Sequence, residues 1–226
     1  MPGNGRTRQS RSVKRSTPGT RKVNITIYIF CEGKNTEPVY INDFTKEHGN
    51  PSLVNIEVEG ARGDPSALLR VAKQKKKELD KAKKKNSELS KAFEVWILFD
   101  RDEHHHVPDT INNARESAIK VGFSNPCFEI WPILHIQSHT RADHRHTLQK
   151  LLSDLMPNYD HDNEAIIDYK QIHNDYNAAK KRATKLPIKH KAEGIDKISE
   201  MNPFTNVHIL LDTIQSGGKK TKKLNP

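Results

Sequence analysis

Residues 25–38 read ITIYIFCEGKNTEP, a nearly all-apolar run that passes into a Glu-Gly turn and then into polar residues. A run of this length, rich in Ile and aromatic residues and ending in a turn signal, is typical of a strand buried on both faces of a parallel sheet. Pro38 is well tolerated in the first turn of a helix. The stretch therefore predicts a strand, a turn and a helix in direct succession, which is the beginning of an α/β fold.

The turn between this predicted strand and helix holds Glu32, Gly33, Lys34 and Glu37. Gly33 would allow the backbone to turn tightly, since it has no Cβ atom. Open α/β sheets bind their ligands at the carboxyl ends of the strands. We therefore expect two carboxylates and the amino end of a helix at a ligand-binding edge of the sheet.

A second stretch, residues 94–106, reads EVWILFDRDEHHH and repeats this arrangement. Asp100 and Asp102 follow the apolar run, and alternate side chains of an extended chain point to the same side. Two such carboxylates repel unless a cation lies between them or one is protonated. Carboxylate oxygens suit Mg²⁺ or Mn²⁺. Because Glu32 ends another predicted parallel strand, these three carboxylates could meet at one edge of the sheet.

A third strand-turn-helix junction is expected further along the chain. Residues 108–121 have the pattern of a helix that ends at Gly122, a short strand could follow around Phe123, and Ser124-Asn125-Pro126 predicts the start of another helix. Glu129 then falls in the first turn, where the helix dipole alone would account for an acid. Its position at a third junction nevertheless makes Glu129 a candidate fourth carboxylate of the same edge.

The histidines and cysteines give little support to a zinc site or a disulfide framework. His104, His105 and His106 are consecutive and would point in different directions, so a polar loop is the simpler interpretation. Cys31 and Cys127 lie in separate apolar stretches, as expected in a reducing compartment. No apolar run reaches membrane length and no signal peptide precedes the predicted fold. We therefore expect a cytoplasmic protein.

The net charge of +10 is concentrated at the two ends of the chain. Residues 1–22 hold seven basic groups and no acid, and residues 217–226 hold four lysines, so residues 23–216 sum to about minus one. The sequence predicts disordered basic tails at 1–22 and 217–226, an α/β core over 23–136, and a helical extension over 137–216 packed on that core. The tails could bind phosphate backbones or could simply keep the protein soluble.

A long lysine-rich helix is predicted to begin at Pro65, after a Gly-Asp-Pro turn. Leu68, Ala72 and Leu79 fall on one face, and eight lysines cover the rest. Such lysines are most often a solvated face whose aliphatic stems cover apolar surface. The alternative is a ridge that follows the phosphates of a nucleic acid.

Three motifs together resemble those of the RloB-like, also AbiLii-like, family of bacterial anti-phage defence proteins, whose core is a Toprim domain. The motifs are FCEGKNTEPVY at residues 30–40, LFDRDEH at residues 98–104 and SNPCFEIW at residues 124–131. The resemblance covers roughly residues 23–215. It implies a Toprim-like α/β fold, with an open sheet of about four mainly parallel strands flanked by helices and a C-terminal helical extension.

The resemblance also implies roles for individual residues. Glu32 would match the Toprim glutamate, a general acid/base or metal ligand, and Asp100 and Asp102 would match the metal-binding pair. Glu37 would be similar to the additional acid of nuclease-type Toprim domains. Glu129 matches the family's own Asn-Pro-Cys-Phe-Glu motif and is a further candidate metal ligand.

The function implied by this resemblance is phosphodiester hydrolysis of nucleic acid in abortive-infection defence, with DNA favoured over RNA and with Mg²⁺ or Mn²⁺ as cofactor. Lys34 could offset charge at the phosphate. An ATPase partner encoded nearby is also implied. The alternative is a non-catalytic nucleic-acid-binding or regulatory subunit of a defence complex, which would use the basic tails.

Overall fold

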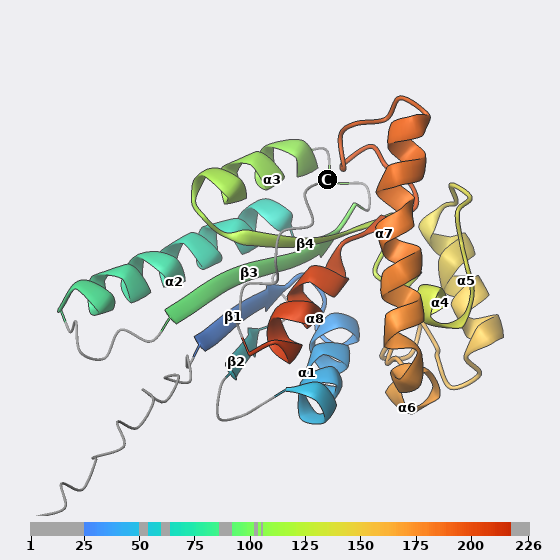
Figure 1. Ribbon diagram of the computed structural model, residues 1–226, viewed down its shortest axis with the longest axis horizontal. Coiled ribbons are helices and arrows are strands. Elements are labelled where there is room, and N and C mark those ends of the chain that lie inside the picture. The colour runs from blue at the N-terminus through green and yellow to red at the C-terminus, as the bar shows by residue number, and fades with distance from the viewer. Residues whose placement is uncertain are drawn as a thin grey trace, which may run out of the picture.

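A computed structural model describes residues 25–49, 54–59, 64–85, 92–101, 104 and 106–217. Its centre is an open sheet with strand order β2-β1-β3-β4-β5 (Figure 1). The strands are β1 (Ile25–Cys31), β2 (Val54–Glu59), β3 (Ala92–Asp100), β4 (Lys120–Asn125) and β5 (Phe204–Thr205). The first four pair in parallel, and the two-residue β5 pairs antiparallel with β4. The predicted α/β class with about four mainly parallel strands is therefore confirmed.

Helices cover both faces of the sheet (Figure 1). Along β1, Ile27 and Ile29 face one buried cluster and Phe30 faces the other, as the alternation of a strand requires. The second cluster holds α2 and α3, and the first holds the remaining long helices. The bounds are α1 (Thr36–His48), α2 (Pro65–Lys85), α3 (Val107–Glu116), α4 (Ile130–Ile136), α5 (Arg145–Leu155), α6 (Tyr169–Ile172), the 3-10 helix η2 (His173–Asp175), α7 (Tyr176–Ala192) and α8 (Val207–Gln215).

The segment predicted as a helical extension, residues 137–216, contributes to the same core as β1 and β3. Leu152 of α5 and Leu186 of α7 belong to the first cluster, together with Ile27. Four apolar residues of α8 are buried in this core: Val207, Leu210, Leu211 and Ile214. This helix begins at Val207, directly after the short strand β5 and Asn206.

The predicted helix over residues 108–121 is too long, because α3 ends at Glu116 and Val121 lies in β4. Ala118 has φ of 52°, a left-handed conformation that reverses the chain without a glycine. The Ile119 N–H donates to the Ala114 carbonyl at 2.9 Å, which gives this carbonyl of the last turn a hydrogen-bond partner. No glycine or proline at this point signals the change from helix to strand.

The Ser124-Asn125-Pro126 signal is also wrong as a helix start. Ser124 and Asn125 pair with β5, the Asn125-Pro126 peptide bond is cis, and α4 begins only at Ile130. Glu129 therefore immediately precedes the helix instead of lying within its first turn. Pro132 is the third residue of α4, where the missing N–H costs no intrahelical hydrogen bond.

The predicted basic tails, residues 1–22 and 217–226, lie outside the described residues except for Gly217. No helix in the described part of the chain has both the length and the apolar character needed to cross a membrane.

Candidate functional site: a carboxylate edge

The carboxyl ends of β1, β3 and β4 lie side by side because these strands pair in parallel and in register. Cys31 is opposite Leu98, and Asp100 is opposite Ser124. The pairing continues one residue past β1, where the Glu32 N–H donates to the Leu98 carbonyl at 3.0 Å. Side chains that follow each strand are therefore brought to a common edge, as expected for a parallel sheet.

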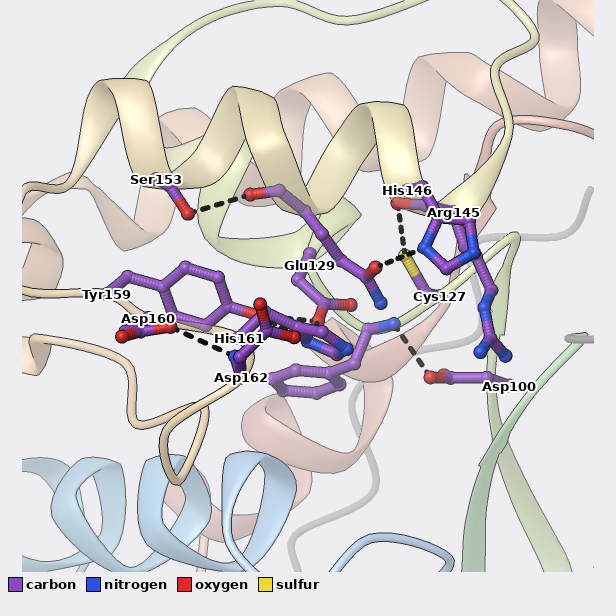
Figure 2. A network of polar contacts seen from close by, with 12 residues as sticks. Asp100, Cys127, Glu129, Arg145, His146, Ser153, Tyr159, Asp160, His161 and Asp162 are labelled. Carbon is purple, nitrogen blue, oxygen red and sulfur yellow. Dashed lines mark hydrogen bonds and ion pairs between the residues drawn. The ribbon is translucent and has the colours of Figure 1, made fainter.

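Glu32 and Asp100, which are 68 residues apart in sequence, are in direct contact at this edge. The Asp100 N–H donates to Glu32 Oε2 at 3.2 Å. The Asp100 carboxylate is held in turn, because its Oδ2 accepts a hydrogen bond from the Phe128 N–H at 2.9 Å. Figure 2 shows this last bond, with the Arg145 side chain extending towards Asp100 from the start of α5. Three separate segments of the chain thus fix the two carboxylates.

His104 contacts Glu32. The run of three histidines, interpreted from the sequence as a polar loop, did not predict this contact. His104 Nε2 lies 2.8 Å from Glu32 Oε1, and the Arg101 guanidinium donates to the His104 carbonyl. Each Glu32 oxygen therefore has a named partner, Oε1 on His104 and Oε2 on the Asp100 N–H. The side chain of Glu32 is 16% exposed, so solvent or a ligand can still reach it.

Glu37 is buried one turn into α1, and the Gly33 N–H donates to its Oε1 at 3.4 Å. Burial raises the pKa of Glu37 to about 7, with a further upward contribution from the charges of Glu129 and Glu32. A Cβ atom on Gly33 would lie 2.3 Å from Glu37 Oε2. The glycine therefore leaves room for the close approach of this carboxylate, and its backbone is not in the left-handed region.

Glu129 is buried and is held by two residues of the loop between α5 and α6 (Figure 2). The Tyr159 hydroxyl donates to Glu129 Oε1 at 2.6 Å, and His161 Nδ1 lies 3.3 Å from the same oxygen. Burial alone would raise the pKa of Glu129, but the hydrogen bonds from His161 and Tyr159 outweigh it and lower that pKa. The same contact with Glu129 raises the pKa of His161. No local sequence signal marked Tyr159 or His161.

Replacing His161 by Gln is expected to destabilise the protein in a pH-dependent way. The raised pKa of His161 contributes stability that is present below its unfolded value of 6.5 and is lost as pH rises through the folded value. The lowered pKa of Glu129 contributes stability that is present above its unfolded value of 4.5 and is lost as pH falls through the folded value. The difference in the free energy of unfolding between wild type and variant should therefore be largest between these two values.

Thermal or urea unfolding of both proteins across this pH range, and at about pH 8.5, would measure that difference. Its decline above the unfolded pKa of His161 is the expected result. A difference that does not change with pH would contradict the ion pair between His161 and Glu129.

The other predicted site residues do not all lie with Glu32 and Asp100 in the structure. Lys34 is exposed in the turn after Glu32. Asp102 lies outside the described residues. Across the described ranges, no three His, Cys, Asp or Glu side chains are arranged so that they could hold a metal ion together. The structure therefore does not bring Glu37 and Glu129 into a common ligand set with Glu32 and Asp100.

Negative charge is nevertheless concentrated here. Burial raises the pKa of the Cys31 thiol, and the charges of Glu37 and Asp100 raise it further. Cys127 is affected in the same way by burial and then by Glu129 and Asp100. Mg²⁺ is usually bound through one or two carboxylates, with water and substrate phosphate completing its shell. Glu32 and Asp100 are a donor set that fits an ion bound in this way.

Comparison with known proteins gave one match. A family model described as RloB-like protein matches residues 27–214, which includes Glu32, Glu37, Asp100 and Glu129. No curated protein and no solved structure matches the chain.

Proposed function

Because the chain belongs to the RloB-like family, we propose that it is a metal-dependent nuclease of the Toprim type that acts in bacterial anti-phage defence. The observation that carries this proposal is the contact between Glu32 and Asp100, which joins the ends of two adjacent parallel strands. Two fixed, partly accessible carboxylates at such an edge suit the binding of a divalent ion and a phosphate.

The chemistry proposed for this edge is hydrolysis of a phosphodiester bond. Glu32, Asp100 and Asp102 would hold Mg²⁺ or Mn²⁺, which when bound lowers the pKa of a water molecule and neutralises charge on the phosphate. In the alternative role, Glu32 would leave the metal to Asp100 and Asp102 and accept the proton of the attacking water, with His104, 2.8 Å from its Oε1, orienting it. Lys34, exposed beside Glu32, would offset charge on the phosphate.

The proposal extends to the cellular setting. We propose a cytoplasmic protein that acts on DNA in preference to RNA and works with an ATPase partner in abortive infection. The family supports an association with defence, and the partner and substrate follow from the resemblance of the motifs.

Removal of divalent metal is expected to abolish cleavage. Purified protein would be incubated with plasmid, single-stranded DNA and RNA in Mg²⁺, in Mn²⁺ and in excess EDTA, with and without the ATPase encoded beside it. Cleavage in either metal and none in EDTA is the expected result. If no nucleic acid is cut in either metal while an active ATPase partner is present, the nuclease proposal fails.

A further inference from the structure

The most basic helix in the described part of the chain is α2. Residues 65–85 contain nine basic and two acidic residues, a net charge of plus seven. The other basic helix is α7, with six basic and no acidic residues over 176–192. Since residues 23–216 sum to about minus one, the remainder of that segment carries a net charge of about minus fourteen. A near-neutral body thus has its positive charge gathered on two helices, α2 and α7.

Five of these cations form a continuous line on the solvent face of α2, which we call the basic stripe: Arg70, Lys73, Lys77, Lys81 and Lys84. All five are exposed. Their spacings of three and four residues place them on one side of the helix, away from the buried Leu68 and Ala72. At 1.5 Å per residue the stripe is about 21 Å long.

The stripe cations differ in their contacts from Lys75 and Lys76, which are partly buried. Lys75 lies over the Tyr28 ring at 4.4 Å, and Lys76 pairs with Asp80 at 2.7 Å. None of the five stripe cations forms an ion pair with a carboxylate in the described part of the chain. Like charges at i and i+4 destabilise a helix, so the line Lys73, Lys77, Lys81 works against the stability of α2.

The stripe begins at the same sheet edge as the carboxylates. α2 runs back from the carboxyl end of β2, so its amino end lies beside that of α3 (Figure 1). A groove of about 430 Å³ lies between the two helix starts. Its lining includes Arg70, Lys73, His106, Asn113 and one carboxylate, Asp109, which lies 3.9 Å from His106. His106 belongs to the segment that follows Asp100. Two cations of the stripe, Arg70 and Lys73, therefore line the groove together with His106.

We propose that the basic stripe and this groove bind the sugar-phosphate backbone of nucleic acid and lead it to the carboxylate edge. The inference rests on the proposed function for the identity of its ligand. Lysine and arginine that neutralise phosphates release condensed counterions, which gives an affinity that is independent of sequence and sensitive to salt. The repelling line of charge on α2 is then a feature retained for binding, at the expense of helix stability.

The test is the binding of a labelled DNA duplex and a labelled single strand to the full chain, followed by fluorescence anisotropy in EDTA across a range of salt concentrations. Lys77→Gln combined with Lys81→Gln is expected to weaken binding at least about 10-fold at low salt and to reduce the slope of log K against log salt by about two. Because Gln and Lys have similar helix propensity, the melting temperature should be unchanged or higher.

The matched control is Lys181→Gln combined with Lys185→Gln, which removes two exposed lysines at the same spacing from α7. This control should bind like the wild type. Equal losses in both variants would mean that net charge alone governs binding, and an unchanged affinity and salt slope in the α2 variant would exclude the stripe. Loss of binding to anionic lipid vesicles, with DNA binding intact, would assign α2 to a membrane surface and overturn the proposal.

The two proposals can fail separately because binding is measured without metal. If the wild-type protein binds nucleic acid through α2 but never cuts it, the binding proposal stands and the nuclease proposal fails. If the α2 variant binds normally and still cuts in the presence of metal, the nuclease proposal stands and the binding proposal fails.

Discussion

Asp100→Asn is expected to lower metal-dependent cleavage by at least about 100-fold, since even loss of a residue that only supports a metal ligand costs 10–100-fold. The substitution removes the negative charge and leaves an amide oxygen that can still accept the hydrogen bond from the Phe128 N–H. An alanine would leave that N–H without its partner, which can cost about 1–3 kcal/mol if the group stays buried. The amide variant therefore separates the loss of chemistry from the loss of stability.

Glu32→Gln should lower cleavage by a similar factor, because it removes the other negative charge of the pair. Its amide oxygen can still accept the hydrogen bond from the Asp100 N–H, so the fold should be retained. If the two carboxylates act as one unit, the double variant should be little worse than either single variant. Initial cleavage rates and melting temperatures would be measured together, with Asp43→Asn on α1 as the control for removal of a carboxylate that pairs with Lys46. Retention of activity within a few-fold in Asp100→Asn would place the active site elsewhere.

Gly33→Ala is expected to lower the free energy of unfolding by about 2–3 kcal/mol, through overpacking and a displaced hydrogen bond. The three atoms nearest the added Cβ all belong to Glu37, with Oε2 at 2.3 Å. Because Glu37 is only 4% exposed, its carboxylate has little room to move aside. For a chain of this size the loss corresponds to a fall of about 4–12 °C in melting temperature.

A double-mutant cycle with Glu37→Ala tests this explanation directly. Gly33→Ala should be strongly destabilising when Glu37 is present and nearly neutral when position 37 has no carboxylate. Chemical denaturation of the four proteins gives the interaction energy. An equal cost of Gly33→Ala in both backgrounds would show that backbone conformation, and not the approach of Glu37, requires the glycine.

The sequence alone determined the sheet and the meeting of its key residues. The apolar runs that became β1 and β3 are patterns of adjacent residues, which periodicity reports directly. Parallel pairing then brings the ends of these strands to one edge whatever the rest of the chain does. For that reason Glu32 and Asp100 could be predicted to lie together, and the structure places them in contact.

The partners of these carboxylates were decided by the tertiary structure alone. His104 is 72 residues from Glu32, and Tyr159 is 30 residues from Glu129. A buried carboxylate requires hydrogen-bond donors, but the donors can come from any segment that packs nearby, and loops carry no period that identifies them. The end of α3 at Glu116 was hidden for a related reason, since the left-handed conformation of Ala118 that follows it is held by hydrogen bonds and not signalled by a glycine. Residue pattern therefore fixed where the charges gather, and three-dimensional packing fixed what holds them.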